Sequence, residues 1–317
     1  MKTILITGVA GFIGSTLAEL LLEKYHIIGI DNFDNFYDRS IKEKNIEPLV
    51  GNNSFTFIEG SILDLENLYN FSNTPDCIIH LAARAGVHLS INIPQDYIET
   101  NIKGTQAVLD FMVNRKVKKL IFGSSSSVYG DSDNVPFCED LVTDSQISPY
   151  AVTKKAGELL CSTFSHLYDL DILCLRFFTV YGPRQRPDLA IHKFFKLIES
   201  RKPIQLYGDG TMARDYTYIH DTVAGIQLSL EYLFKHNGVF EIINLGNEYP
   251  VSLSDLVLRI SEIVPEKFII EYTKEKPGDV KITYANINKA KRILGYNPKI
   301  SINQGLKLFH EWYIGNK

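Results

Sequence analysis

The chain has 317 residues, of which 45% are hydrophobic, and its formal net charge at pH 7 is −4. This length is enough for one large domain or for two smaller ones that share a core. The slightly acidic balance does not indicate a nucleic-acid surface, and no stretch approaches the ~20 apolar residues of a membrane helix. Residues 1–8 are too short for a signal peptide, and the four cysteines lack metal-ligand spacing. We therefore expect a cytoplasmic protein with reduced thiols and no metal.

The first predicted elements are a strand over Thr3–Thr7, a glycine-rich turn over Gly8–Gly14 and an amphipathic helix over Ser15–Lys24. Such a turn lets backbone N–H groups approach a pyrophosphate, and the helix N-terminus adds partial positive charge. The spacing is G-x-x-G-x-x-G rather than G-x-G-x-x-G, so an ordinary strand-to-helix turn stays open. The next predicted strand, His26–Ile30, ends in Asp31. A carboxylate there binds both adenosine ribose hydroxyls and repels a 2′-phosphate, which favours NAD over NADP.

Strands and helices alternate over residues 1–176. Further strands are expected over Phe55–Glu59, Cys77–Leu81, Lys118–Phe122 and Ile172–Phe177, and helices near Ser40–Leu49, Asp64–Phe71, Asp96–Val113 and Tyr150–Tyr168. This order predicts an α/β fold with a Rossmann-type doubly wound parallel sheet. Ligands bind at the carboxyl ends of such strands, where Ser61 and Ile62 can edge an adenine pocket and small residues after Leu81 let a ligand approach the backbone. His80 is interpreted as a packed, hydrogen-bonded side chain.

Tyr150 and Lys154 lie one turn apart on a predicted helix and therefore point to the same face. Free tyrosine has a pKa near ~10 and is a poor base at neutral pH. A fixed ammonium about 4 Å away lowers that pKa by at most about 3 units, before desolvation opposes it. The pair predicts a general base, although Tyr-x-x-x-Lys also occurs on surface helices. The serines over Ser124–Ser127 follow a predicted strand without the G-x-S-x-G elbow of a hydrolase, and we interpret them as holding a substrate for Tyr150.

The pattern changes after residue 176. We expect an NAD-binding Rossmann domain over residues 1–176, with a return segment of about 217–247, and a smaller α+β substrate domain over the rest of 177–317. The expected elements of 177–317 are a Pro- and Arg-rich loop over Thr179–Asp188, helices over Phe194–Glu199 and Tyr218–Lys235, strands over Ile204–Tyr207 and Ile242–Leu245, and a small α+β cap over Leu253–Lys317. Scattered arginines suit a diphosphate ligand, although a single arginine is more often a solvated surface charge.

Six motifs in this order resemble the extended short-chain dehydrogenase/reductase family, in particular its nucleotide-sugar epimerases and dehydratases. They are Gly8-x-x-Gly11-x-x-Gly14, the strand end His80–Ala83, the run Ser125–Gly130, the pair Tyr150-x-x-x-Lys154, the run Arg176–Pro183 and the run Arg214–Tyr218. The resemblance covers nearly the whole chain. It implies NAD held through the catalytic cycle, a UDP- or dTDP-sugar in the cap, and a homodimer through the helices over Asp96–Val113 and Tyr150–Tyr168.

The resemblance also implies roles for individual residues. Tyr150 is the base, Lys154 lowers its pKa and holds the nicotinamide ribose, and Ser125 bonds to the sugar hydroxyl. The implied cofactor contacts are Gly8, Gly11, Phe12, Ile13, Gly14, Asp31, Asn32, Ser61, Ile62, Leu81, Ala82, Ala83, Tyr150 and Lys154. The implied substrate contacts are Ser126, Ser127, Thr179, Arg186, Gln205, Tyr207, Arg214, Lys276 and Asp279.

The serine run also bears on which reaction of the family to expect. The dehydratases have two acids at the places of Ser126 and Ser127, and the UDP-glucuronate decarboxylases have a glutamate at the place of Ser127. Hydroxyls cannot replace these carboxylates, which leaves epimerisation at carbon 4 through a 4-keto sugar, with NAD taking and returning the hydride. The run over Arg176–Asp188 looks most like the UDP-glucuronate 4-epimerases. We hypothesise that Arg186 binds the sugar carboxylate in a bidentate way, together with Ser127 and Thr179.

Other substrates and functions stay open. His88 stands where the glucuronate enzymes usually have arginine, and Thr283 stands where glucose-selective epimerases have a bulky tyrosine, so a 2-acetamido group would fit there. The alternatives are 4-epimerisation of UDP-glucose, of UDP-N-acetylglucosamine or of its uronic acid. A UDP-glucuronate decarboxylase and a non-catalytic NAD(P)-binding protein are less favoured, since the latter typically lacks a base such as Tyr150.

Overall fold

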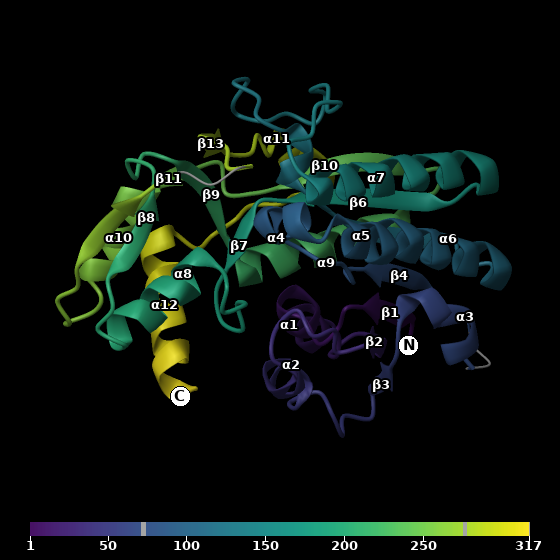
Figure 1. Ribbon diagram of the computed structural model, residues 1–317. Helices are drawn as coiled ribbons and strands as arrows, with labels where there is room; N and C mark the ends of the chain where they lie inside the picture. Colours follow the sequence, from purple (N-terminus) through teal and green to yellow (C-terminus); the bar gives the residue numbers. More distant parts are fainter. Residues whose placement is uncertain (71–73, 275–277, 317) are drawn as a thin grey trace.

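The computed structural model of the protein describes residues 1–70, 74–274 and 278–316. Seven parallel strands in these residues form the main sheet, in the order β3 (Phe55–Glu59), β2 (His26–Asp31), β1 (Thr3–Thr7), β4 (Cys77–His80), β5 (Lys119–Ser125), β6 (Asp171–Phe177) and β10 (Phe240–Leu245). The chain starts at β1, winds outward to β3, returns to β4 and then winds the other way. This confirms the predicted α/β fold with a Rossmann-type doubly wound parallel sheet (Figure 1).

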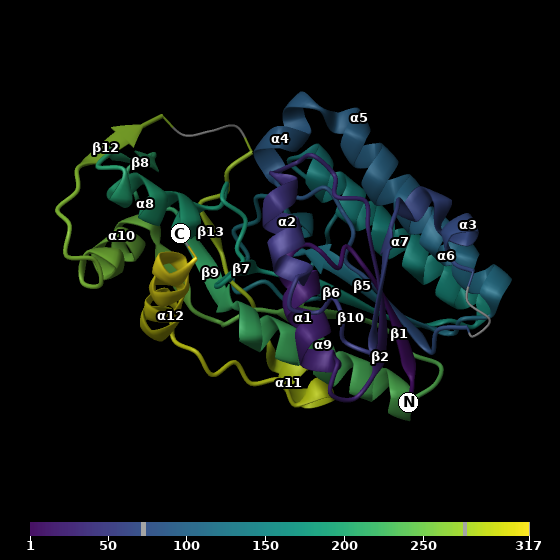
Figure 2. The same cartoon turned by 90° about the horizontal axis from the view of Figure 1, so that it is seen from below.

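Helices connect the strands and cover the sheet. Their bounds are α1 (Phe12–Leu21), α2 (Arg39–Ile46), η1 (Ile62–Asp64), α3 (Leu65–Leu68), α4 (Val87–Asn92), α5 (Pro94–Tyr97), η2 (Ile98–Lys103), α6 (Gly104–Arg115), η3 (Ser126–Tyr129), α7 (Pro149–Tyr168), α8 (Ala190–Glu199), α9 (Ile219–Lys235), α10 (Leu253–Ser261), α11 (Asn288–Leu294) and α12 (Ile302–Gly315). Helices α1 and α9 lie on one face of the main sheet, and α6 and α7 lie on the other (Figure 2).

Neighbouring residues of a main-sheet strand are buried on opposite faces. In β1, Ile4 and Ile6 belong to the hydrophobic cluster that includes α1 and α9 residues, whereas Leu5 belongs to the cluster that includes α6 residues. Both faces of the sheet are therefore covered by helices, which is why these strands read as continuous apolar runs in the sequence.

Two predicted boundaries at the ligand edge of the sheet differ from the structure. Helix α1 begins at Phe12 rather than Ser15, because Gly11 is its N-cap and already accepts a hydrogen bond from the Ser15 N–H at 3.0 Å. Strand β5 continues to Ser125, because Ser124 and Ser125 pair in register with β6. Two of the four serines therefore belong to the strand rather than to the turn after it.

The predicted helix over Asp96–Val113 is a run of α5, the π-helical segment η2 and α6. Within η2, the buried Asn101 side chain bonds to the backbone N–H and C=O of Arg84 at 2.8 and 3.0 Å, and to Thr153 Oγ1 at 2.9 Å. Wide π turns of this kind occur where a helix is locally distorted for a tertiary contact. The predicted helix over Asp64–Phe71 instead begins as η1, α3 ends at Leu68, and Phe71 lies outside the described residues.

A smaller lobe lies beside the main sheet and contains two further sheets (Figure 1). Its central strand, β9, pairs with three others, and a separate pair of strands lies next to it. The bounds are β7 (Thr179–Tyr181), β8 (Ile204–Tyr207), β9 (Ala213–Tyr218), β11 (Pro250–Ser252), β12 (Ile270–Thr273) and β13 (Ile282–Thr283). Residues 179–181, predicted as loop, are therefore a strand, because β9 supplies a ladder partner.

Buried contacts join the two lobes. The carboxylate of Asp215, on β9, accepts backbone N–H groups from Asn247 at 2.7 Å, Glu248 at 3.0 Å and Ala285 at 3.1 Å. Helix α11 packs on α9 and β10, so the C-terminal region also contacts the main sheet. All four cysteines are free thiols. Within the described ranges, no helix has the length and apolar character needed to cross a membrane.

Candidate active site

A cleft of about 1180 Å³ lies between the carboxyl ends of the main-sheet strands and the smaller lobe. Its walls come from the turns after β1, β2, β4 and β5, from the start of α7, and from β7, β8 and β9. The strand order reverses between β1 and β4, which is the point where doubly wound sheets bind ligands. Every described residue of the predicted cofactor and substrate sets lines this cleft, and Lys276 lies outside the described residues.

The glycine turn after β1 is packed too closely for side chains. Gly8 has a φ of +73°, and a Cβ there would lie 2.7 Å from the backbone nitrogen of Ala82. A Cβ on Gly14 would lie 2.2 Å from the carbonyl oxygen of Gly8. Gly11 caps α1 without a side-chain hydrogen bond and lines the cleft, so the first helical N–H groups can bind an anion. This cradle fits the pyrophosphate of a dinucleotide.

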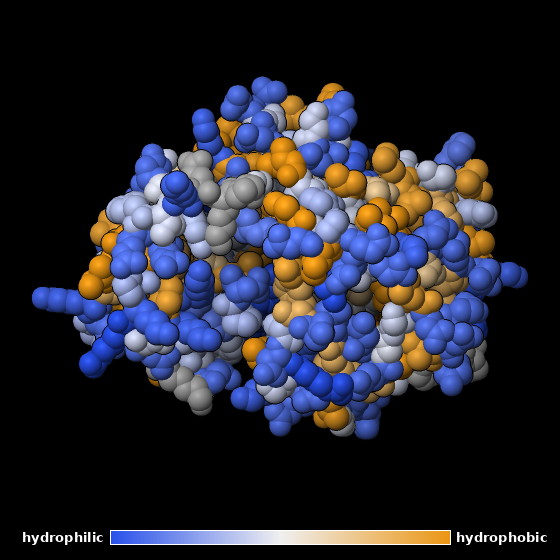
Figure 3. Space-filling model, in the orientation of Figure 1, coloured by the Kyte–Doolittle hydropathy of each residue, from blue (hydrophilic) through white to orange (hydrophobic). Residues whose placement is uncertain are grey.

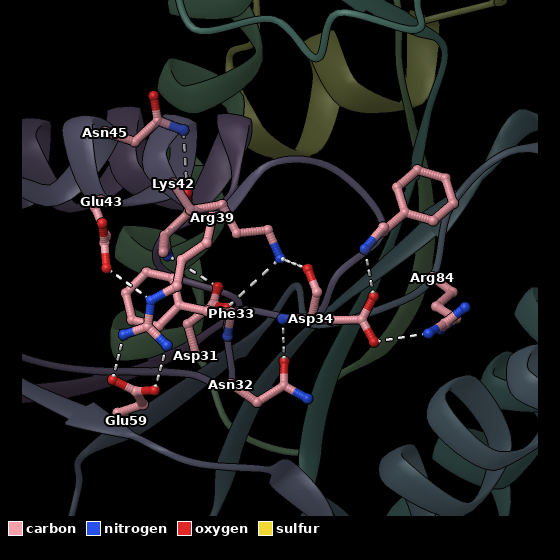
Figure 4. A network of polar contacts seen from close by, with 12 residues as sticks. Asp31, Asn32, Phe33, Asp34, Arg39, Lys42, Glu43, Asn45, Glu59 and Arg84 are labelled. Carbon is pink, nitrogen blue, oxygen red and sulfur yellow. Dashed lines mark hydrogen bonds and ion pairs between the residues drawn. The ribbon is translucent and has the colours of Figure 1, made fainter.

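Asp31, at the end of β2, provides the acidic group of the cofactor side. Its buried carboxylate accepts backbone N–H groups from Ala10 at 3.0 Å and Phe33 at 2.9 Å, and Lys42 Nζ lies 4.0 Å from its Oδ1 (Figure 4). Burial raises the pKa of Asp31, and Lys42 and the two N–H groups oppose that rise. Carboxylate oxygens retain further lone pairs for ribose hydroxyls, so the residues present fit NAD. The neighbouring cleft residues include Asn32, Ser61 and Ile62.

Other side chains of the cofactor side follow no motif in the sequence. They are Asp34, Phe36, Tyr37, Lys42 and Arg84. Arg84 forms an ion pair with Asp34 at 2.8 Å, and Lys42 Nζ donates to the backbone oxygen of Asp34 at 2.8 Å (Figure 4). Arg84 also pairs with Asp96 at 2.9 Å. These contacts tie the segment after β2 to the turn after β4 and to α5. Tertiary contacts, rather than a local spacing, therefore place these residues at the cleft.

The three predicted catalytic side chains meet at the end of β5. Tyr150 lies in the first turn of α7, which Ser148 caps by accepting a backbone N–H at 3.2 Å. Ser125 lines the same cleft as Tyr150, and its Oγ accepts from the Ser127 backbone N–H at 3.2 Å and from Ser127 Oγ at 3.0 Å. One turn further along α7, the buried Lys154 donates from Nζ to the carbonyl oxygen of Gly123 at 2.7 Å. A phenol, a hydroxyl and an ammonium are thus gathered in one cleft, as proton transfer at a substrate hydroxyl requires.

Burial is the main electrostatic influence on Tyr150 and Lys154. Burial raises the pKa of Tyr150, while the hydrogen bond from Ser125 and the positive charge of Arg186 oppose the rise. Burial also lowers the pKa of Lys154 to about 8. That Lys154 lowers the pKa of Tyr150 stays a prediction, which the pH profile of a Lys154 variant tests. Desolvation of the phenolate is the larger effect, and the cation that opposes it is Arg186.

A buried ion pair joins α7, the helix that carries Tyr150 and Lys154, to the main sheet. Glu158, on α7, accepts from Arg176 Nε at 2.8 Å and Nη2 at 2.9 Å, and Ser124 Oγ donates to it at 2.6 Å. All three side chains are buried, and they join α7 to β5 and β6. The sequence identifies Arg176 only as part of a family run and does not identify Glu158, because the pairing spans two elements.

His80 has the structural role expected from the sequence. Its Nδ1 lies 2.7 Å from Thr7 Oγ1 and its Nε2 lies 3.2 Å from Thr105 Oγ1. Burial lowers its pKa to about 3, so the ring is neutral at physiological pH. The interpretation of a packed, hydrogen-bonded histidine is confirmed.

Two arginines face the cleft from the smaller lobe. Arg186 binds Asp188 through Nε at 2.9 Å and Nη2 at 2.6 Å. Arg214, on β9, donates to the backbone oxygen of Ala213 at 2.9 Å, and its Nη2 lies 3.9 Å from Asp279. The same Asp279 carboxylate lies 3.3 Å from His88 Nε2, on α4, so it links the smaller lobe to the main one. The remaining predicted substrate residues in the cleft are Ser126, Ser127, Thr179, Gln205 and Tyr207.

The fold and the site together define a class of protein. It is a Rossmann-type, dinucleotide-binding enzyme with a Ser–Tyr–Lys group at the sheet edge and a second lobe that presents arginines to an anionic substrate. No group of three or more potential metal ligands occurs in the described part of the chain.

Comparisons with known proteins specify the family. A family model described as GDP-mannose 4,6 dehydratase matches residues 5–309. A UDP-glucuronate 4-epimerase of Thermodesulfobacterium geofontis is 43% identical over 97% of this chain and 95% of its own. A Bacillus cereus UDP-glucuronic acid 4-epimerase, solved with UDP-glucuronic acid and NAD, has a TM-score of 0.92 at 38% identity and covers 99% of this chain and 100% of its own. A Methanobrevibacter ruminantium UDP-N-acetylglucosamine 4-epimerase has a TM-score of 0.90 at 30% identity and covers 100% of this chain and 99% of its own. The chain therefore belongs to the extended short-chain dehydrogenase/reductase family.

Proposed function

We propose that this protein is an NAD-dependent 4-epimerase that converts UDP-glucuronate to UDP-galacturonate through a 4-keto sugar. The observation that carries the proposal is the group Ser125, Tyr150 and Lys154 in one cleft with the glycine turn, Asp31 and the guanidinium of Arg186. The Bacillus cereus enzyme, which resembles this chain over 99% of its length, was solved with UDP-glucuronic acid and NAD.

Each of these cleft residues has a separate role in the proposed epimerisation. When bound, NAD accepts a hydride from carbon 4 of the sugar and returns it. Tyr150 takes the proton of the 4-hydroxyl, and Ser125 holds that oxygen through a hydrogen bond. Lys154 presents donors beside them, and Arg214 holds the diphosphate. The cleft of about 1180 Å³ gives the sugar ring room to turn about this tether, so that hydride returns to the opposite face.

The side chains of the serine run support epimerisation over the other reactions of the family. The matching family model is described as a dehydratase, yet Ser126 and Ser127 carry no carboxylate to act as acid or base. Arg186, with Ser127 and Thr179, suits the carboxylate of a uronic acid, because a guanidinium binds carboxylates in a planar, bidentate geometry. A 4-keto uronic acid is a β-keto acid, and we propose that this hold keeps it from losing CO₂.

A second substrate class also has structural support. Thr283, on β13, is a small residue that lines the cleft, so it leaves room for a 2-acetamido group. The Methanobrevibacter ruminantium neighbour is named as a UDP-N-acetylglucosamine 4-epimerase. UDP-N-acetylglucosamine, its uronic acid and UDP-glucose are therefore the alternatives in a substrate panel.

The test is a product analysis without added NAD. Purified protein is incubated with UDP-glucuronate, UDP-glucose and UDP-N-acetylglucosamine in turn, and products are identified by mass spectrometry and NMR. We expect UDP-galacturonate from the first. Tyr150→Phe should lower kcat by about 10²–10⁴-fold, since it removes the general base, while UDP-glucuronate still binds. Activity that survives this substitution would reject Tyr150 as the base, and no product from UDP-glucuronate would reject the substrate.

We also propose a homodimer in a reducing cytosol. Exposed apolar side chains gather over α4–α7, where Figure 3 shows orange surface, and they include Leu89, Ile91, Ile98, Val152 and Leu159. Val152 and Leu159 are 48% and 58% exposed and lie on one face of α7. A second copy of the chain would cover this surface. Four free thiols, three of them buried, suit the cytosol.

A further inference from the structure

The Arg-Pro-Asp turn after β7 holds Arg186 in a defined orientation. The guanidinium carbon lies 4.7 Å from the centre of the Phe36 ring, and the carboxylate of Asp188 accepts from Nε at 2.9 Å and from Nη2 at 2.6 Å. Pro187, between the two charged residues, fixes its own φ and so limits their relative movement. One face and one edge of the guanidinium are thus already engaged by the protein.

The contacts of Asp188 use only one edge of Arg186. A guanidinium has five N–H donors, and Asp188 takes one from Nε and one from Nη2. The edge formed by Nη1 and the second Nη2 hydrogen has the same bidentate geometry for another carboxylate. The Arg186 side chain is 14% exposed and that of Asp188 is 49% exposed, so Asp188 holds Arg186 from the solvent side of the cleft. Arg186 and Tyr150 line the same cleft, so the guanidinium and the catalytic hydroxyl both face the substrate site.

We propose that Asp188 is the specificity-determining positioning residue for the uronic acid substrate: it holds the Nε–Nη2 edge of Arg186 so that the Nη1–Nη2 edge receives the sugar carboxylate. This inference rests on the proposed function. An arginine that is already oriented loses less conformational freedom when it binds the carboxylate, so the substrate binds more tightly. A simple competition between Asp188 and the substrate for the same edge would have the opposite effect on binding.

The restraint of Arg186 by Asp188 also affects a side reaction, the loss of CO₂ from the 4-keto sugar. In the 4-keto sugar the C5–C6 bond can break, with its electron pair forming the C4–C5 enolate as CO₂ leaves and a solvent proton then adding at C5. Bond breaking requires the carboxylate to turn out of the ring plane. A guanidinium fixed by Asp188 and Phe36 resists that turn, whereas a mobile guanidinium follows it. Asp188 therefore protects the intermediate as well as selecting the substrate.

The test compares Asp188→Asn with wild type and with the matched control Glu241→Gln, which removes one charge from a surface ion pair 2.7 Å from Lys289. We expect Asp188→Asn to raise the Kd and KM for UDP-glucuronate about tenfold or more, since a charge-assisted contact to Arg186 is lost. The Kd for UDP-glucose, which has no carboxylate, should stay the same. CO₂ and UDP-4-keto-pentose should form a larger share of the products. Glu241→Gln should match wild type in every assay.

The outcomes distinguish a failure of the proposed function from a failure of the proposed role of Asp188. If wild type makes no UDP-galacturonate, the proposed function fails. If wild type makes it but Asp188→Asn has an unchanged KM and an unchanged product ratio, the role of Asp188 is overturned. Tighter binding of UDP-glucuronate by Asp188→Asn would overturn it too, because it would identify Asp188 as a competitor. An equal loss of affinity for UDP-glucose would show a merely structural effect, and thermal melting of all variants checks that each is folded.

Discussion

Gly14 shows how strictly one residue can be constrained by the dinucleotide fold. It lies in the first turn of α1, where a Cβ would be 2.2 Å from the carbonyl oxygen of Gly8. We expect Gly14→Ala to destabilise the protein by about 1–3 kcal/mol or more, because backbone atoms must move, and to weaken NAD binding. Gly315→Ala, where no atom lies near the added Cβ, is the control and should change stability by no more than about 1 kcal/mol. Denaturant unfolding and NAD titration measure both effects, and equal results for the two variants would contradict the prediction.

Tyr150 and Lys154 give the reaction a definite pH dependence. Burial raises the pKa of Tyr150, so the phenolate fraction rises about tenfold per pH unit in the neutral range. Burial lowers the pKa of Lys154 to about 8, so its charge is lost above that pH. We expect kcat/KM for UDP-glucuronate to rise from about pH 6 to about pH 8 and then to level off. Lys154→Arg, which keeps its charge, should move the levelling to higher pH, and a wild-type profile that falls between pH 6 and 8 would be evidence against this account.

Helix α7 carries the base, and its attachment to the sheet depends on the buried Glu158–Arg176 pair. Glu158→Gln leaves a buried guanidinium without its counter-charge and should destabilise the protein by about 3–5 kcal/mol. It should also lower kcat, because Tyr150 and Lys154 lie on the same helix. Glu231→Gln, at a partly exposed ion pair 3.5 Å from Lys24, is the comparison and should cost at most about 1 kcal/mol. Similar unfolding free energies for both variants would show that the buried pair does not anchor α7.

The strands and helices at the ligand edge differ in how well local sequence predicts them. Strand β3 matches its predicted residues, because the β-favouring run Phe55–Ile58 lies between polar turns. Strand β7 reads as loop, since its three residues become a strand only through pairing with β9. The extra length of β5 likewise comes from its register with β6. Strand ends that depend on a distant partner leave no local signal.

At the scale of the whole molecule, the proposed homodimer depends on the exposed apolar face of α7. The double variant Val152→Glu/Leu159→Glu places two charges on the exposed apolar face of α7. We expect light scattering after size-exclusion chromatography to show a dimer for the wild type and a monomer for this variant. Leu258→Glu, at a residue 60% exposed on α10 of the smaller lobe, should remain dimeric. A monomeric wild type would reject the homodimer.

The order of elements and the types of cleft residue follow from local sequence. Apolar runs between polar turns predict a parallel sheet, because such strands are buried on both faces. Gly8, Gly11 and Gly14, the acid at Asp31 and the Tyr150–Lys154 spacing mark the cofactor side and the base, because each depends on neighbours within one turn or one strand.

Tertiary structure decided which of these groups act on one another. It placed Arg186 over the ring of Phe36, buried Glu158 against Arg176, and brought Asp279 to His88 across the cleft. It also made burial, rather than Lys154, the main influence on the pKa of Tyr150. Desolvation and long-range pairing depend on what surrounds a side chain in space, and those surroundings cannot be inferred from residue spacing along the chain.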